Sequence, residues 1–203
     1  MTIDELYEKL SSRQFQDTQN GDLFYNFFVY QYPAEKEYEI RQQIKEFKEQ
    51  LIRPINYVDV LTMNLFEEFC NFLDSQSFGK LHPSYLKYLI EKDGSNPKSV
   101  TKTLTNKANS DAFYEYVHNK IIQHISIKDD KIRPYIFLYG IGSMYPYLRT
   151  NVFLTNYEKY NQSSNYKLIV FYPGKVDKNT YHLFGMLNDE HTYRATLLIN
   201  DRQ

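Results

Sequence analysis

Apolar side chains in the first third of the chain alternate between two kinds of pattern. Residues Leu23 to Tyr30 form a short, dense aromatic and aliphatic run, which predicts a buried strand. After Pro33, an apolar stripe with helical spacing consists of Ile40, Ile44, Phe47 and Leu51. Residues Ile55 to Leu61 predict a second strand. A second helical stripe then consists of Leu65, Phe66, Phe69, Cys70 and Leu73. This order is typical of a parallel sheet with right-handed crossovers.

The middle of the chain has a different pattern. Residues Pro83 to Ile90 and Asp111 to Ile125 predict helices, whereas Ser99 to Leu104 is ambiguous. Residues 79–132 therefore predict a helical insertion between the second and third strands. Because no glycine-rich linker sets this insertion apart, we expect a single domain over residues 1–203.

Strand patterns resume after the insertion. We predict a third strand at Pro134 to Tyr139, a fourth at Lys167 to Tyr172 and a fifth at Tyr193 to Ile199, whose weak alternation suits a sheet edge. Between the third and fourth strands, Met144 to Tyr160 predicts a helix with a break near Thr150. The sequence thus predicts an α/β fold with a mostly parallel sheet of about five strands flanked by helices.

The composition narrows the class of protein. The chain has 203 residues, of which 42% are hydrophobic and 24% charged, as in globular domains. Its formal net charge of -1 argues against a strongly basic nucleic-acid binder. The single cysteine, Cys70, excludes an internal disulfide and a multi-cysteine zinc site. Because there is no run of about 18 apolar residues and no signal peptide, we expect a soluble intracellular protein.

Charge and aromatic residues are unevenly distributed. Residues 1–80 contain 8 Lys and Arg against 14 Asp and Glu, whereas residues 81–203 contain 16 against 11. The two parts either attract each other in the folded chain or face different partners. The chain has 20 Tyr and 14 Phe but no Trp. Tyrosine suits binding surfaces, although codon drift in an AT-rich genome would give the same bias.

The most suggestive local motif is Gly140-x-Gly142-Ser143, which lies where the third strand meets a helix. Glycines there allow a positive φ and the close approach of an anionic ligand, or they serve only a tight turn of the fold. A phosphate loop would need a lysine and a different spacing. The dinucleotide fingerprint is also incomplete, because Tyr145 stands at its third glycine.

Other candidate groups do not form a complete catalytic set. None of the five histidines belongs to a metal-ligating pair with the usual spacing. Cys70 lies on an apolar stripe, which suggests a buried filler and not a nucleophile. Asp59 and Asp177 are acids that could lie near the strand ends, where a lone acid is more often a helix cap or turn residue. We therefore expect no catalytic residues, no metal and no cofactor.

The predicted strand ends nevertheless define a candidate binding surface. In a parallel sheet the carboxyl ends share one rim, where open α/β folds bind ligands. The turn-forming segments that would meet there are Tyr32-Pro33, Thr62, Gly140 to Ser143, and Tyr172 to Gly174, where Pro173-Gly174 closes the fourth strand. Arg194, on the last strand, either clamps an anion at this rim or points to solvent. The candidate binding residues are Tyr32, Pro33, Gly140, Gly142, Ser143, Tyr172, Pro173, Gly174 and Arg194. Such a tyrosine- and glycine-rich surface is better suited to binding a partner than to catalysing a reaction.

These segments resemble a known family. The chain reads FFVYQYPAEKEYEIRQQI and INYVDVLTMNL near its start, then LYGIGSMYPYLRT and LIVFYPGKVDKNTYHLFGMLNDEHTYRA near its end. Together they resemble the B component of BREX (BrxB), from the bacteriophage-exclusion defence islands of bacteria. The most specific part is the FYPG-to-LFG block with the following YRA, combined with the upstream GxGSxxP segment. The resemblance covers most of the chain outside residues 79–132.

The resemblance implies a cytoplasmic accessory protein of an anti-phage system that marks host DNA by methylation and blocks unmarked phage. It implies no catalytic residues. The implied partners are other BREX components: the alkaline-phosphatase-superfamily protein PglZ, the large ATPase BrxC and the adenine methyltransferase PglX. Of these, PglZ is the direct contact that we expect.

Three hypotheses follow. The first is a non-catalytic adaptor that binds other BREX components. The alternative is a degenerate nucleotide- or anion-binding regulatory module that uses the Gly140 to Ser143 turn. A third is nucleic-acid contact through residues 80–133, which hold 10 Lys and Arg against 6 Asp and Glu, too weak a bias for us to expect direct binding.

Overall fold

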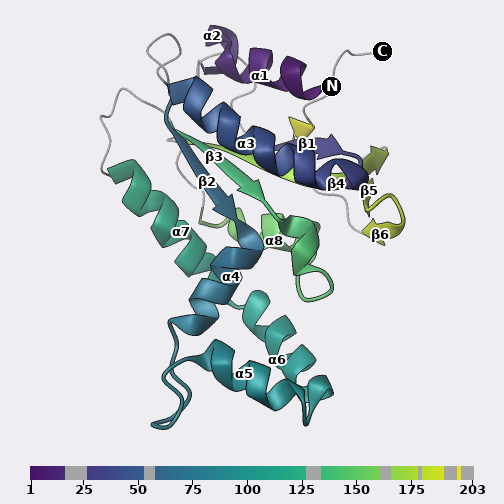
Figure 1. Cartoon of the computed structure of the whole chain (residues 1–203). Helices are drawn as coiled ribbons and strands as arrows, with labels where there is room; N and C mark the ends of the chain where they lie inside the picture. Colours follow the sequence, from purple (N-terminus) through teal and green to yellow (C-terminus); the bar gives the residue numbers. More distant parts are fainter. Residues whose placement is uncertain are drawn as a thin grey trace.

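A parallel β-sheet forms the centre of the fold (Figure 1). The computed structural model describes residues 1–16, 27–52, 58–126, 134–160, 166–177, 180–189 and 196–197. Within this part of the chain, five parallel strands lie in the order β2-β3-β4-β1-β7. Their bounds are β1 Phe27–Tyr32, β2 Val60–Asn64, β3 Tyr135–Tyr139, β4 Lys167–Asp177 and β7 Thr196–Leu197. The predicted α/β fold with a mostly parallel sheet of about five strands is thus confirmed.

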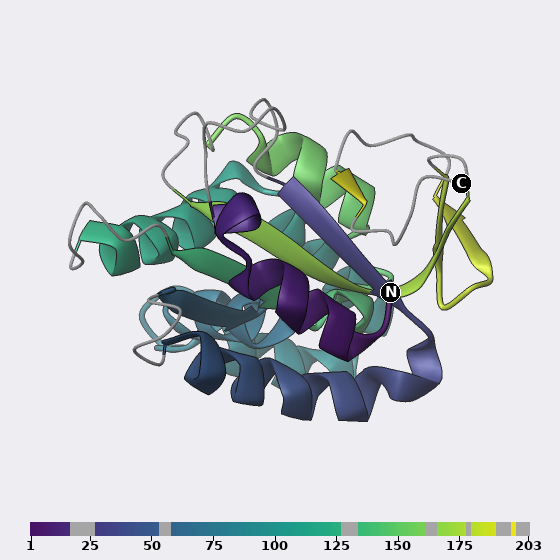
Figure 2. The same ribbon diagram turned by 90° about the horizontal axis from the view of Figure 1, so that it is seen from above.

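Helices cover both faces of this sheet (Figures 1 and 2). The helices α1 Ile3–Ser11, α2 Arg13–Gln16 and α3 Glu37–Ile52 pack on one face. The 3-10 turn η1 Ala34–Lys36 leads from β1 into α3. The other face is covered by α4 Leu65–Asp74, α7 Asp111–Ser126 and α8 Thr150–Tyr157. The helices α5 Tyr85–Asp93 and α6 Pro97–Ala108 lie beyond α4, away from the sheet. No helix in the described part is both long and apolar enough to cross a bilayer.

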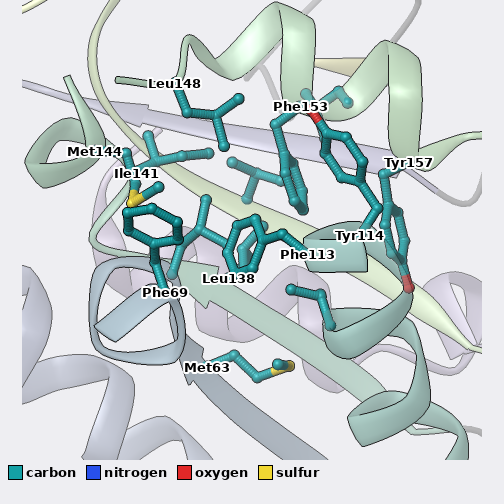
Figure 3. Packing of buried hydrophobic residues seen from close by; sticks show 14 of the residues in the cluster. Met63, Phe69, Phe113, Tyr114, Leu138, Ile141, Met144, Leu148, Phe153 and Tyr157 are labelled. Carbon is teal, nitrogen blue, oxygen red and sulfur yellow. The ribbon is translucent and has the colours of Figure 1, made fainter. Parts of the chain in front are cut away.

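The alternation of side chains along β1 divides the core into two layers. Phe27 and Val29 join the cluster under α4, α7 and α8, whereas Phe28 and Tyr30 join the cluster under α1 and α3. Figure 3 shows the first of these clusters, where aromatic rings from several helices meet the strands. Each large side chain buried in this way stabilises the fold by about 1.5–3 kcal/mol, so both faces need their helices.

The strongly periodic segments form the predicted helices. All four members of the first stripe are buried on α3: Ile40, Ile44, Phe47 and Leu51. The second stripe belongs to α4, but Phe66 is exposed and Cys70 is only half-buried. The ambiguous segment Ser99 to Leu104 lies within α6, which begins at Pro97 with Asn96 as its cap. The predicted helical insertion between β2 and β3 is therefore present as α5, α6 and α7.

Two strands differ from their predicted bounds. The first was expected at Leu23 to Tyr30 and is found at Phe27–Tyr32; residues 23–26 lie outside the described part. The second was expected to end at Leu61, but β2 pairs with β3 as far as Asn64. Thr62 therefore lies inside β2 and not at its end. An apolar run buried on both faces gives no alternation that would mark its limits.

The predicted helix at Met144 to Tyr160 is wrong in its first half. A 3-10 turn, η2 Ile141–Met144, is followed by an irregular segment, and α8 begins only at Thr150. Pro146 explains the gap, because a residue before proline is restricted to extended backbone, and Tyr145 has φ -67° and ψ 137°. The predicted break near Thr150 is thus the start of the helix.

The fourth strand does not close at Pro173-Gly174. Instead, β4 pairs with β1 as far as Pro173 and then with β5 from Gly174 onward, so the proline stands where the partner changes. Together β5 Thr180–Leu183 and β6 Leu187–Asp189 form an antiparallel hairpin that the sequence analysis missed (Figure 2). Of the predicted fifth strand, the structure describes only β7, which pairs with β1 at the sheet edge, as predicted.

Candidate binding rim at the strand ends

The carboxyl ends of the strands bring most of the candidate residues together. In the sheet register Tyr32 is paired with Pro173, so Pro33 and Gly174 follow at the same level. On the other side of β4, β3 ends at Tyr139 and leads directly into Gly140 and η2. We call this surface, from β1 and η1 across β4 to η2, the rim. Arg194 lies outside the described residues.

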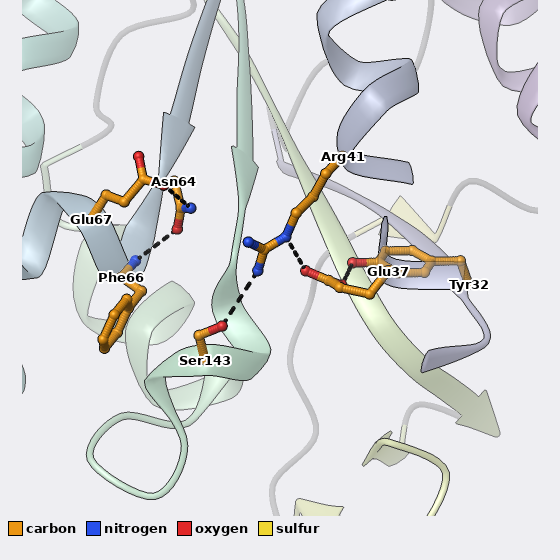
Figure 4. A network of polar contacts seen from close by, with 7 residues as sticks. All are labelled: Tyr32, Glu37, Arg41, Asn64, Phe66, Glu67 and Ser143. Atoms are coloured by element: carbon orange, nitrogen blue, oxygen red, sulfur yellow. Dashed lines mark hydrogen bonds and ion pairs between the residues drawn. The ribbon is translucent and has the colours of Figure 1, made fainter. Parts of the chain in front are cut away.

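A chain of polar contacts links two parts of the rim (Figure 4). The Tyr32 hydroxyl donates to the Glu37 carboxylate, which also accepts from Arg41 Nε at 2.7 Å. The second nitrogen of the Arg41 fork, Nη2, donates to Ser143 Oγ at 3.4 Å. Burial, followed by the bond to Glu37, raises the pKa of Tyr32 well above its usual range. Tyr32 therefore stays a neutral donor, and this chain of contacts orients Arg41 toward η2.

Gly140 has a packing role that only glycine can fill. Its φ is +71°, and a Cβ added to it would overlap Asn64 Oδ1 and lie 2.9 Å from Asn64 Cγ. The same Asn64 side chain caps α4, because Oδ1 accepts from Phe66 N at 3.2 Å and Nδ2 donates to Glu67 at 2.8 Å. The left-handed turn after β3 therefore leaves room for the cap of α4.

Neighbouring groups also take up the space at the Cβ positions of Gly142 and Gly174. A Cβ on Gly142 would lie 2.8 Å from the Phe184 ring and 3.0 Å from Pro173 Cγ. A Cβ on Gly174 would overlap the backbone carbonyl of His182 in the paired strand. Gly142 and Gly174 thus allow the hairpin to pack against η2 and β4.

The tip of the β5–β6 hairpin places apolar side chains at this rim. Phe184 N donates to Pro173 O at 2.9 Å, and Phe184 has a positive φ of 56°. Phe184 is 38% exposed, Met186 is 80% exposed, and Tyr145 beside Gly142 is also exposed. A phenylalanine with left-handed backbone is uncommon, and the surrounding contacts must hold it there. The sequence signal for this hairpin is the Phe184-Gly185 step between two short apolar segments.

The remaining candidates lie elsewhere. Thr62 lines a shallow depression of about 300 Å³ between β2 and α7, together with Leu61, Met63, Glu68, Lys120, Gln123 and His124. Asp59 immediately precedes β2, so it lies at the amino end of the strands and not near the rim, and it contacts His124 Nε2 at 2.6 Å. Asp177 is the last residue of β4.

The described side chains at the rim do not include an activated nucleophile. Ser143 Oγ is held by Arg41, and Tyr32 is kept protonated by burial and by Glu37. On α4, burial and then Glu67 raise the pKa of the Cys70 thiol, which makes it a poorer nucleophile. No group of three His, Cys, Asp or Glu side chains suited to a metal occurs among the described residues. The exposed side chains at the rim include Tyr145, Phe184 and Met186, together with Ser143 and the charged Glu35 and Lys36 of η1.

Comparison with known proteins gives two matches. The family model described as BREX protein BrxB matches residues 61–198. A curated protein from Bacillus cereus (strain H3081.97), named BREX protein BrxB, is 24% identical over 202 residues, covering 98% of this chain and 96% of the relative. No solved structure matches the chain.

Proposed function

The chain belongs to the BrxB family of the BREX antiviral defence system, and we propose that it acts there as a non-catalytic adaptor. Family membership places the protein in BREX, and a role as a connector of other components is our inference. The adaptor role is supported by the rim, because open α/β folds bind ligands at the carboxyl ends of their strands. At that position the hairpin presents Phe184 and Met186 to solvent.

The backbone of Phe184 supports this reading. Left-handed backbone at a phenylalanine costs about 1–2 kcal/mol. Here it belongs to the tight turn that closes the hairpin, in which Phe184 and Gly185 both have positive φ and Met186 N donates to Leu183 O at 3.2 Å. Packing on Gly142 and the hydrogen bond to Pro173 O hold the residue in place. The result is a rigid apolar tip at the rim, and rigid anchors bind partners with a small loss of entropy.

We propose that PglZ is the direct partner, with BrxC and PglX joining in a larger assembly. The resemblance of the chain to BrxB supports this choice. Stable protein interfaces bury about 1,200–2,000 Å² in total. Such a complex should therefore survive size-exclusion chromatography at micromolar concentration.

Co-purification tests the proposal. Tagged wild-type chain should retain PglZ under mild salt, and Met186→Glu should weaken retention at least about tenfold, because it places a charge in a desolvated contact. The control is Ile52→Glu, an exposed apolar residue at the far end of α3 from the rim. If wild-type chain retains no BREX component, the adaptor role is wrong. If Met186→Glu and Ile52→Glu reduced PglZ retention equally, the rim would not be part of the interface.

The anion-binding alternative rests on one observation, the guanidinium of Arg41 beside Ser143 at the rim. Two observations argue against this alternative. The space beside Gly140 and Gly142 is taken up by Asn64 and Phe184, and η2 is only a 3-10 turn of four residues. If the alternative held, ATP, GTP or a cyclic nucleotide at 100 times its dissociation constant would stabilise the chain by about 2.7 kcal/mol. We expect no thermal shift at millimolar ligand.

A further inference from the structure

The first part of the helical insertion forms a lobe whose net charge is opposite in sign to that of the rest of the chain. Residues 78–110, here called the lysine lobe, comprise the turn after α4 and the helices α5 and α6. The lobe contains six lysines and two acids, a net of +4, while the whole chain has a net charge of -1. The remainder of the chain therefore carries -5. Figure 1 shows α5 and α6 at the end of the molecule away from the sheet.

A cluster of aromatic rings makes the lobe rigid. Phe78 stacks on Tyr88 with ring centroids 4.1 Å apart, and both rings stack with Tyr85. Lys107 Nζ lies 5.0 Å from the centre of the Tyr85 ring, and Lys92 Nζ lies 5.5 Å from that of Tyr88. The rings therefore stack on one another and under lysine ammonium groups.

Within the part of the chain that the structure describes, no carboxylate forms an ion pair with a lysine of the lobe. Lys107 donates instead to the neutral Gln76 side chain, at 2.7 Å. Lys80, Lys87, Lys98 and Lys102 are exposed. Unpaired surface charge of one sign creates a potential that attracts an oppositely charged surface.

Two aliphatic side chains stand out among these lysines. Leu81 is 87% exposed at the tip of the turn, and Ile90 on α5 is 66% exposed. The turn is fixed at its base, because Phe78 N donates to His82 O at 2.9 Å and Tyr85 N donates to Gln76 O at 2.7 Å. Leu81 is therefore held out from a firm support, as an anchor side chain would be.

We propose that the lysine lobe is a second docking surface, which binds an acidic surface of a partner protein that has an apolar pocket for Leu81. The proposal rests on the adaptor function and names the chemistry of its partner. Charge complementarity selects an acidic partner. The exposed aliphatic side chains favour a protein over a nucleic acid, because Leu81 and Ile90 contribute nothing to a phosphate contact. The aromatic rings of the lobe already stack on one another and under lysines, so they are not free to stack on bases.

The test uses the BREX component that co-purifies with the wild-type chain. Its affinity is measured for the purified wild-type chain and for variants of the lobe. We expect Lys80→Glu/Lys87→Glu to lower the affinity at least about tenfold at about 50 mM salt, and less at about 300 mM salt, because screening weakens exposed charge pairs. Leu81→Asp should lower the affinity by a similar factor. Glu at position 87 also completes a capping box with Ser84, so the double variant should fold.

The matched control is Lys45→Glu/Lys48→Glu on α3, which makes the same change in net charge on the acidic body. It should bind within about twofold of the wild type if the lobe is the docking surface. If the partner binds all variants equally, the lobe proposal is wrong while the adaptor function stands. If the wild type binds no BREX component, the adaptor function itself fails.

Two further results would overturn the proposal in favour of another occupant. Binding of duplex or single-stranded DNA that Lys80→Glu/Lys87→Glu abolishes would make the lobe a nucleic-acid surface. Self-association of the wild type that the same variant abolishes, measured by light scattering, would identify the acidic body of a second copy as the occupant.

Discussion

Replacing Gly140 by alanine tests the packing that connects the rim to α4. Gly140 has a φ of +71°, which costs an L-residue about 1–2 kcal/mol. The new methyl group would also overlap the Asn64 side chain, so the asparagine must leave its place as the cap of α4. Loss of an asparagine cap costs about 1 kcal/mol. Gly140→Ala should therefore destabilise the chain by about 2–3 kcal/mol.

A second glycine separates the two causes. Gly79 has a similar φ of +64°, but nothing lies within 4 Å of the position of its Cβ. Gly79→Ala should therefore cost only the backbone strain, about 1–2 kcal/mol. The difference between the two variants, about 1 kcal/mol, measures the overlap with Asn64.

Urea unfolding followed by circular dichroism provides the free energies, with unchanged m-values as the check on two-state behaviour. A double-mutant cycle with Asn64→Ala completes the test, because removing the asparagine removes both the cap and the overlap. Gly140→Ala should then cost only about 1–2 kcal/mol in the Asn64→Ala background. Additive effects of the two substitutions, or equal costs for Gly140→Ala and Gly79→Ala, would refute the reasoning.

Two other predictions concern the hairpin and the pH dependence of stability. Gly174→Ala would place a methyl group against the His182 carbonyl, which is backbone and cannot rotate away, so limited proteolysis should cut residues 180–189 sooner than in the wild type. Burial lowers the pKa of His118 below its usual value of 6.5, so the unfolded chain binds more protons there. Stability due to this group is present above pH 6.5 and falls as the pH drops below it; His118→Gln should flatten that slope in urea titrations, and an unchanged slope would contradict the assignment.

The sequence predicts the strongly periodic helices of this fold better than the limits of its first two strands. The stripe from Ile40 to Leu51 recurs at helical spacing, and all four of its apolar members are buried on α3. By contrast, the end of β2 was placed at Leu61 instead of Asn64. Helical periodicity is a property of local spacing, whereas the end of a buried strand depends on how far its neighbour β3 continues to pair.

The sequence also located the rim but not its contents. The rule that parallel strands end on one edge correctly brought Tyr32 and Pro173 together. It failed for Asp59, because β2 begins at Val60, just after this acid, whereas the predicted strand from Ile55 to Leu61 placed it near the carboxyl end. The roles of Gly140 and Gly142 depend on Asn64 and Phe184, which are distant in sequence, so no local pattern could reveal them.

The helix α4 gives a physical reason to expect the rim and the lysine lobe to act on the same partner. It begins at the Asn64 cap beside Gly140 and ends at Asp74, whose carboxylate accepts from Ser84 Oγ, the cap of α5. Its ten residues span about 15 Å between the Asn64 cap and the Asp74 contact with the lysine lobe. Because α4 is packed into the core through Phe69, its two ends cannot move independently. A single partner that contacts both surfaces should therefore lose affinity for the Met186→Glu and Leu81→Asp variants alike.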